Sequence, residues 1–281
     1  MQKKRKPIKV YIAILNEGDV CVQLSQMITQ IVVDCLKTKR WQPTIQYSNV
    51  TNVDYNRNQI TKMFLESDCE WLLMIDEDNP PLRNPLELIE FNKDIMVLPT
   101  LMMKNDKATD NNTRLAFNCF KTIKVGKKKG FTTVVNDGNK LFKMDWGGTG
   151  CILIRRDVLE TIPKPFMSLP DKTYGIRKRG EDIYFCQRAT KKGFEVWGHW
   201  DYTCSHFKRV DLLTIADLII KAKTNEKSIE QITPLLSIIS EGKGKLSRDG
   251  ISASESGGRD IGQGKRRKSK VSGKRKKRTG K

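Results

Sequence analysis

The stretch "LLMIDEDNPP" at 72–81 concentrates groups that can do chemistry. An apolar run ends at three consecutive carboxylates, Asp76, Glu77 and Asp78. In an extended chain Asp76 and Asp78, two positions apart, point to the same side and Glu77 faces away. Such oxygen ligands suit Mg²⁺ or Mn²⁺, usually together with substrate phosphates. The pattern predicts a metal site. The alternative is a solvated loop or a helix N-cap, which Asn79 and the prolines also suit.

A second acidic pair stands before an amphipathic helical pattern, in "GED" at 180–182. Glu181 and Asp182 therefore lie at or near a helix N-terminus. A carboxylate aimed into a cleft from that position can act as a general base. We interpret Asp182 in this way, with Glu181 beside it. Ordinary acidic capping of the helix is the alternative interpretation.

Two more features complete the candidate site. His206 follows a strand-like run in "TCSHF", and we interpret it as a third metal ligand beside Asp76 and Asp78, against a purely structural role. The segment "WGGTG" offers Trp146 as a platform on which a sugar ring can stack. Its glycines, including Gly148, let a ligand approach the backbone. The alternative for this segment is a tight turn.

These residues need a scaffold, and the first half of the chain predicts one. The runs at 8–15, 44–50 and 70–76 are β-rich, and the stretches between them carry apolar residues at helical spacing. A short helix at 84–92 and a strand at 94–103 follow. Strands alternating with helices predict a parallel α/β sheet covered on both faces. In such sheets ligands bind beyond the carboxyl ends of the strands, where 76–78 would lie.

The second half is less regular. Short strands at 115–122 and 131–136 flank the basic loop "KVGKKKG", and a glycine-rich turn then leads into a strand and a helix over 144–162. An amphipathic helix at 181–193 stops at Gly193, and a further strand follows it. Two helical stretches, near 211–223 and 226–240, end the patterned part. We therefore expect an α/β domain over 8–210 and C-terminal helices over 211–241.

The net charge of +20 is concentrated at the two ends of the chain. Residues 242–281 hold 15 Lys and Arg against 3 Asp and Glu, and a basic extension at 1–7 adds four more cations. The tail at 242–281 has few large apolar residues and is expected to be disordered. Its charge predicts a polyanion partner, either nucleic acid or an anionic lipid surface, unless it is simply a solvated end.

Composition excludes some classes of protein. No apolar run approaches the roughly 20 residues that span a bilayer, and the apolar run at 10–15 is too short for a secretory signal. A soluble, cytoplasmic protein is expected. The seven cysteines form no CxxC motif, which predicts reduced, buried thiols rather than a disulfide framework or a zinc site.

Over roughly 8–208 the chain resembles the family 2 glycosyltransferases, which are nucleotide-sugar enzymes with the GT-A fold. Four motifs occur in the family's order. They are the polar turn Asn16-Glu17-Gly18 after the first strand, the Arg57-Asn58 pair, "CEWLLMIDEDNPP", and "GGTGCILIRRDVLETI" followed by "GEDIYFCQRATKKGFEVWGHWDYTCSHF". The resemblance implies a GT-A-type, Rossmann-like mixed sheet flanked by helices.

The same resemblance implies sugar transfer from a nucleotide diphosphate sugar to an acceptor hydroxyl, with inversion. Mn²⁺ or Mg²⁺ would be held by Asp78 and His206, and by Asp76 through water. The nucleotide sugar would lie near Asp76, Glu77 and Asp78, with six further residues in contact or close by: Asn16, Glu17, Arg57, Asn58, Trp146 and Gly148. Asp182 would accept the proton of the attacking hydroxyl. The donor sugar, the base and the acceptor are left open.

Two other functions compete with this one. A strand that ends in "DED" also resembles haloacid-dehalogenase-type phosphohydrolases, in which the first Asp is a nucleophile and the third position an acid, but those enzymes usually carry the motif on their first strand. A nucleic-acid-binding or nucleic-acid-modifying protein would use the tail at 242–281. That function is compatible with sugar transfer.

Overall fold

The computed structural model describes residues 6–106, 112–125, 128–170 and 177–208. The domain expected over 8–210 therefore falls almost wholly within the described part, and its boundaries stay a prediction. The basic extension at 1–7 is described only at its last two residues. The helices expected over 211–241 and the tail at 242–281 lie outside the described residues.

The predicted alternation of strand and helix is confirmed in the first half of the chain. Three strands pair in parallel in the order β2-β1-β3, with Ile12 opposite both Ile45 and Leu73. β1 and β3 are apolar and buried almost throughout, as strands covered on both faces are, whereas β2 lies at the edge of the sheet and is only partly buried. The elements are β1 (Ile8–Leu15), α1 (Val22–Thr38), β2 (Trp41–Ser48), α2 (Val53–Glu66) and β3 (Trp71–Asp76).

The second half makes the sheet mixed. β11 lies antiparallel between β3 and β4, β14 runs parallel to β4, and β9 closes the edge antiparallel to β14. The seven strands follow the order β2-β1-β3-β11-β4-β14-β9. The expected mixed α/β sheet flanked by helices is thus confirmed. The four added strands are β4 (Ile95–Val97), β9 (Leu141–Met144), β11 (Cys151–Arg155) and β14 (Val196–His199).

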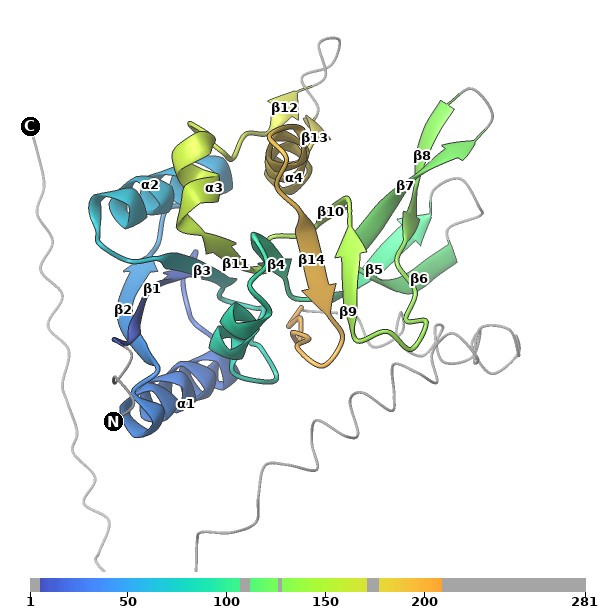
Figure 1. The fold of residues 1–281 in the computed structure, drawn as a ribbon. Helices are drawn as coiled ribbons and strands as arrows, with labels where there is room; N and C mark the ends of the chain where they lie inside the picture. Colours follow the sequence, from blue (N-terminus) through green and yellow to red (C-terminus); the bar gives the residue numbers. More distant parts are fainter. Residues whose placement is uncertain (1–5, 107–111, 126–127, 171–176, 209–281) are drawn as a thin grey trace, which may run out of the picture.

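Helices cover both faces of the sheet (Figure 1). On one face Ile60 and Phe64 of α2 share a buried cluster with α3 and α4, for example through Val158 and Phe185. On the other face α1 and the 3₁₀ helix η1 bury Leu24, Ile28 and Leu86. The remaining helices are η1 (Pro85–Phe91), α3 (Arg156–Thr161) and α4 (Glu181–Lys191).

Short sheets extend from this body. The strand expected over 94–103 is wrong as one element, because the chain leaves the main sheet at Pro99, whose ring nitrogen has no N–H for a ladder. β5 then pairs with β6, and β10, β7 and β8 form a three-stranded sheet (Figure 1). The bounds are β5 (Leu101–Asp106), β6 (Asn112–Phe117), β7 (Cys119–Val125), β8 (Lys128–Thr133), β10 (Trp146–Gly147), β12 (Leu169–Pro170) and β13 (Arg177–Arg179).

Two composition-based expectations can be compared with the structure. Six of the seven cysteines are buried, as expected, and Cys21 is half-buried. Within the described ranges, no helix combines the length and the apolar character needed to cross a bilayer.

Candidate functional site

A cleft of about 210 Å³ opens where β1, β2 and β3 end. Asn16 and Glu17 enter it from the turn after β1, and Val50 and Val53 from the β2–α2 connection. The carboxylates after β3 line the opposite wall. Because parallel strands present their carboxyl ends at one edge, sequence-distant polar residues meet there. The cleft lies where the sequence predicts ligand binding.

The three acids do not alternate as an extended chain would. β3 ends at Asp76, and the chain turns at once, with the Asn79 N–H donating to the Asp76 carbonyl at 3.0 Å. All three carboxylates therefore line the cleft, and the expectation that Glu77 faces away is wrong. The Glu77 carboxylate accepts the backbone N–H of Glu17 at 2.8 Å. It thereby fixes the turn after β1 against the turn after β3.

His206 lies beside Asp78, and the predicted metal-binding role of this pair stays a prediction. Its Nε2 lies 3.6 Å from Oδ2 of Asp78, and its Nδ1 lies 3.2 Å from the carbonyl oxygen of Leu101. When Nδ1 carries the proton and donates it to this carbonyl, the lone pair of Nε2 faces Asp78. A carbonyl partner for the second ring nitrogen is the usual support of a metal-binding histidine.

A short antiparallel ladder explains how His206 reaches Asp78. Backbone N–H groups of Phe207 and Ser205 donate to the carbonyls of Asp78 and Pro80 at 2.9 and 3.0 Å. The N–H of Leu82 donates in return to Thr203 at 2.9 Å. The segment 203–207 thus runs alongside 78–82, at the exit of β3. We call these paired segments the exit ladder.

Lys208 is a functional candidate that sequence reasoning missed. It follows the exit ladder directly, lines the cleft, and forms an ion pair with Asp78. Asn79 donates to the other oxygen of the same carboxylate. The sequence signal was the "HFK" run at 206–208: when His206 and Asp78 meet, a lysine two residues on falls at the same strand end.

Asn56 was also missed. It is buried in the first turns of α2, where its amide donates to the Val50 carbonyl at 3.2 Å, and it lines the cleft. The residue holds the β2–α2 connection in place beside the turn after β1. A polar residue that faces a helix's buried side, one position before Arg57, was the available signal.

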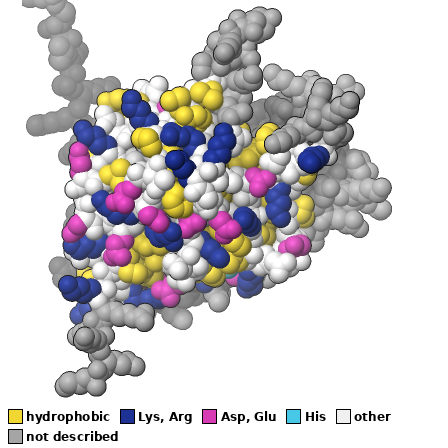
Figure 2. Space-filling view, turned by 45° about the horizontal axis from the view of Figure 1, so that its top comes forward, with side chains coloured by type: hydrophobic (Ala, Val, Ile, Leu, Met, Phe, Trp, Pro, Cys, Tyr) yellow, Lys and Arg dark blue, Asp and Glu magenta, His cyan; other side chains and the backbone are white. Residues whose placement is uncertain are grey.

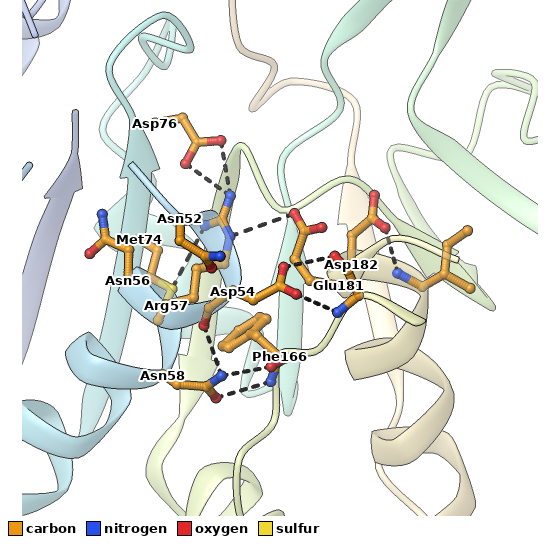
Figure 3. Close-up of polar contacts among 12 residues, drawn as sticks. Asn52, Asp54, Asn56, Arg57, Asn58, Met74, Asp76, Phe166, Glu181 and Asp182 are labelled. Carbon is orange, nitrogen blue, oxygen red and sulfur yellow. Dashed lines mark hydrogen bonds and ion pairs between the residues drawn. The ribbon is translucent and has the colours of Figure 1, made fainter. Parts of the chain in front are cut away.

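Arg57 joins the two acidic motifs instead of lining the cleft (Figure 3). Its side chain is only 2% exposed, and Nη2 donates to both carboxylate oxygens of Asp76 at 2.9 and 3.0 Å. Its Nε lies 3.9 Å from Oε1 of Glu181, at the start of α4. One buried cation therefore holds the end of β3 against the N-terminus of α4.

The environment of Asp76 sets its protonation. Burial raises the pKa of the Asp76 carboxyl to about 6, although the neighbouring Arg57 lowers it. The nearby carboxylates of Asp78 and Glu181 raise the pKa further. Asp76, with 28% of its side chain exposed, therefore takes up a proton at a higher pH than an ordinary aspartate, whose pKa is lower.

Asp182 begins α4 beside Glu181. Its Oδ1 accepts the backbone N–H of Ile183 at 2.6 Å, and Gly180 precedes it as the N-cap (Figure 3). A Cβ at position 180 would lie 2.6 Å from that oxygen, so only glycine leaves room for this arrangement. The positive end of the helix dipole stabilises both carboxylates. Asp182 does not line the cleft of the three acids.

Three predicted residues lie elsewhere. The Asn58 amide donates to the backbone carbonyl of Phe166 at 2.6 Å and accepts its N–H, which fixes the segment after α3 (Figure 3). Trp146 stacks on Phe120, with ring centroids 3.9 Å apart. Gly148 packs so closely on Asn118 that a Cβ would lie 2.6 Å from its amide nitrogen. None of the three predicted residues lines the cleft.

The donor set defines what the cleft can hold. Asp78 and His206 provide one carboxylate and one imidazole at a single point, while Asp76 is engaged by Arg57. Among the described side chains, no group of three or more His, Cys, Asp and Glu is arranged to hold a metal ion by itself. One or two carboxylates with substrate phosphates and water is nonetheless the usual magnesium arrangement, so Asp78 fits a cation that arrives with a phosphate, and the His206 ring lies 3.6 Å from that carboxylate.

Comparisons with known proteins give structural neighbours only. No protein-family model matches the chain, and no curated protein matches it. The structure of A197 from STIV covers 72% of this chain and 87% of its own, with 18% identity and a TM-score of 0.46. GalNAc-T7 in complex with UDP, GalNAc and Mn²⁺ covers 74% of this chain, with 8% identity and a TM-score of 0.41. This chain spans 45% of that protein's length.

An apo UDP-glucose pyrophosphorylase covers 71% of this chain and 74% of its own, with 7% identity and a TM-score of 0.34. Likenesses at this level do not determine what a chain does, since one fold serves many functions. The function must be argued from the residues of the cleft.

Proposed function

We propose that the chain is a metal-dependent glycosyltransferase that moves a sugar from a nucleotide diphosphate sugar to an acceptor hydroxyl with inversion. One observation carries the proposal. The acids after β3 share a cleft at the ends of the parallel strands, and His206 lies 3.6 Å from the last of them. Arg57 joins the first of them to Glu181, next to Asp182.

The nucleoside would occupy the β1–β2 side of the cleft. Asn16 supports this placement, because its buried Oδ1 has no hydrogen-bond partner among the described residues and can accept an N–H from a base. Val50 and Val53 supply apolar contact opposite it. Glu77 would act indirectly, by holding the Glu17 backbone in place.

The metal would be held by Asp78 and His206, with Asp76 contributing through water. When bound, Mn²⁺ or Mg²⁺ neutralises the charge that develops on the diphosphate leaving group. Lys208 adds a second cation on the same side, so it would pair with the diphosphate oxygens when they arrive beside Asp78.

Asp182 would accept the proton of the acceptor hydroxyl as that oxygen attacks the anomeric carbon. Its place beside Glu181 supports this role, because Arg57 ties that end of α4 to the end of β3. A single base on the acceptor side is what inversion requires. Trp146 is proposed to lie on the acceptor side, since β10 packs against α4.

The first experiment is a calorimetric titration of the protein with a nucleoside diphosphate and Mn²⁺. Asp78→Ala should abolish metal-dependent binding, because it removes the carboxylate that faces His206. Glu160→Ala, an exposed acid on α3, is the matched control and should bind like the native protein. An unchanged titration for Asp78→Ala would refute the metal role.

The second experiment tests the base. Asp182→Asn should bind the donor normally and transfer sugar about 10²–10⁴-fold more slowly, the usual contribution of a general base. Transfer is followed by donor consumption with a panel of nucleotide sugars and acceptors. Native rates in the variant would remove Asp182 from the mechanism.

A phosphohydrolase of the haloacid-dehalogenase type is less well supported. Such an enzyme would use Asp76 as a nucleophile, whereas Arg57 holds both of its oxygens and burial raises its pKa to about 6. Incubation with a phosphomonoester and with a sugar nucleotide separates the two reactions by their products.

A further inference from the structure

The β7–β8 hairpin, residues 119–125 and 128–133, differs in charge from the body around it. Residues 119–133 contain five lysines and no acid, although the chain between its basic ends carries nearly equal numbers of both signs. Lys121 and Lys124 are exposed in β7. The hairpin projects from the side opposite α1 and α2 (Figure 1). It is therefore a local basic arm rather than part of a balanced surface.

The strand register places like charges together. Lys124 stands directly opposite position 129, also a lysine, and Val125 stands opposite Lys128. Like charges at opposed positions of an antiparallel pair destabilise the ladder. An anion bound across the pair would relieve this repulsion, so the register itself points to an anionic ligand.

The same register places aromatic rings beside these lysines. Thr122 stands opposite Phe131, and Phe120 opposite Trp146, so positions 120, 122 and 124 share one face with 131 and 146. Phe120 and Trp146 are stacked, and the ring of Phe131 meets the edge of Trp146 at 5.4 Å. Phe131 is 50% exposed and ends this aromatic row.

Phe131 is an exposed ring at the end of the aromatic row, and the opposed positions 124 and 129 form the next pair on the same face of the hairpin. A ring beside lysines combines the two features that bind single-stranded nucleic acid. Lysines take phosphates, and a flat ring stacks on an unpaired base of any sequence. An acidic protein would use the lysines but would not require the ring. Duplex DNA would also leave the ring unused, because its bases are stacked on one another.

We propose that this face of the hairpin, formed around Phe120, Lys124, Phe131 and Trp146, binds single-stranded nucleic acid. The site lies within the described body, so it is separate from the basic tail at 242–281. The inference does not depend on sugar transfer, although Trp146 takes part in both proposals. Phe131 stacks on a base, and Lys124 contacts a flanking phosphate.

The test is fluorescence anisotropy of the full chain with labelled oligo(dT) at several salt concentrations. To remove the contribution of the tail, the full-length protein carries Gln in place of each Lys and Arg at 265–278. Phe131→Ala should weaken binding about 5- to 150-fold, the range for loss of one base stack. The salt dependence should not change, since no charge is lost.

Ile123→Ala is the matched control, because Ile123 is 40% exposed and stands opposite Gly130 on the other face of the hairpin. It should bind like the parent. Both side chains are half-exposed, so neither truncation opens a core cavity, and circular dichroism confirms the fold. Equal losses for Ile123→Ala and Phe131→Ala would overturn the placement of the site.

The lysine pair is tested by Lys124→Gln with Lys129→Gln. Each phosphate contact that is lost should lower the slope of log K against log salt by about 0.7 for a single strand. Lys37→Gln with Lys62→Gln, on α1 and α2, removes the same charge elsewhere and should leave the slope unchanged. An equal change in both pairs would show that only net charge matters and would overturn the proposal.

An abasic strand of the same length, heparin and anionic vesicles identify the ligand class. Phe131→Ala should leave their binding unaltered, because none of them presents a base. Binding of the parent to the abasic strand or to heparin as tight as to oligo(dT) would show a general polyanion surface. That result would overturn recognition of nucleic acid. Tighter binding to vesicles would assign the arm to a lipid surface instead.

Discussion

At the scale of single residues, Arg57 has the largest structural consequence. It is buried, it engages both oxygens of Asp76, and it lies 3.9 Å from Glu181. The carboxylates of Asp76 and Glu181 thus share the one buried guanidinium of Arg57. If the guanidinium is removed, both largely buried carboxylates lose the positive charge that compensates them. Uncompensated charge of this kind costs more free energy than an intact pair contributes.

We therefore expect Arg57→Met to lower the free energy of unfolding by about 3–5 kcal/mol. Urea denaturation followed by circular dichroism measures it. The triple variant with Asp76→Asn and Glu181→Gln should recover much of the loss, because it removes the unpaired charges as well. Lys62→Met, exposed on the same helix, should change stability by no more than about 0.5 kcal/mol. A triple variant no more stable than Arg57→Met would contradict this account.

His199 gives a pH prediction that is independent of the cleft. Its ring lies 4.9 Å from Phe91 and 5.1 Å from Tyr202, and its Nδ1 accepts the backbone N–H of Asp201 at 3.2 Å. Burial lowers the pKa of the imidazole, as do Lys140 and Arg83, while Asp201 raises it. Protonation on Nδ1 would also remove the acceptor of that hydrogen bond.

Because the unfolded chain binds this proton more readily than the folded one, stability rises with pH through the window just below the usual histidine pKa of about 6.5. The contribution is complete above that value and is lost as the pH falls toward the folded pKa. His199→Asn keeps an acceptor atom but cannot be protonated. Urea midpoints at pH 5 and 7.5 should therefore differ less in the variant than in the native chain. Equal differences would rule out His199 as the source.

Residue types could be predicted from the sequence more readily than their partners. The three acids, Glu181 and His206 were identified because each follows a strand or begins a helix. The partners of Arg57 and Asn58 were not predictable, because both face the buried side of α2 and their contacts lie in β3, α4 and the segment after α3. Those contacts depend on how the helices pack, which local spacing does not encode.

At the scale of elements, the exit ladder decides whether the site forms. It pairs 203–207 with 78–82 and so places His206 and Lys208 beside Asp78. Neither segment is a long strand, and each holds the other through a few backbone bonds. Loss of the exit ladder should therefore lower ligand affinity at the cleft far more than it lowers the free energy of unfolding.

Ser205→Pro tests this, because proline has no N–H to donate to the carbonyl of Pro80. Stability should fall by only about 1 kcal/mol, the value of one hydrogen bond. Affinity for Mn²⁺ with a nucleoside diphosphate should fall by about 10- to 100-fold, as when the support of a metal ligand is removed. Ser205→Ala keeps the N–H and should bind normally. Native affinity in Ser205→Pro would show that the ladder does not position the ligands.

Some strands and helices could be predicted from the local sequence pattern, and others could not. β1 through β3 could be predicted, since apolar runs alternate with helical spacing and parallel strands need a helix between them. The position of β11, antiparallel between β3 and β4, could not be predicted. That order depends on pairing between residues 55 to 84 positions apart, and a strand's sequence gives neither its direction nor its neighbours.

At the scale of the whole molecule, charge is separated along the chain. On the face shown in Figure 2, acidic and basic side chains are interspersed. The excess lies at 3–6 and at 242–281, and within the body the hairpin is one local exception. Two basic regions of different design imply two modes of binding: one that depends on charge alone, and one that also uses an aromatic ring.

Duplex DNA separates these modes, because its bases are not available to Phe131. Replacing the ten Lys and Arg at 265–278 by Gln lowers the net charge by half and should remove most duplex retention at low salt. A full-length chain with the same tail residues in scrambled order should bind like the native protein, since counterion release is independent of sequence. Phe131→Ala should not change duplex binding, although it weakens oligo(dT). Loss of duplex affinity in the scrambled-tail variant would contradict a tail that binds through charge alone. Equal weakening of duplex and single-strand binding by Phe131→Ala would contradict base stacking at the hairpin.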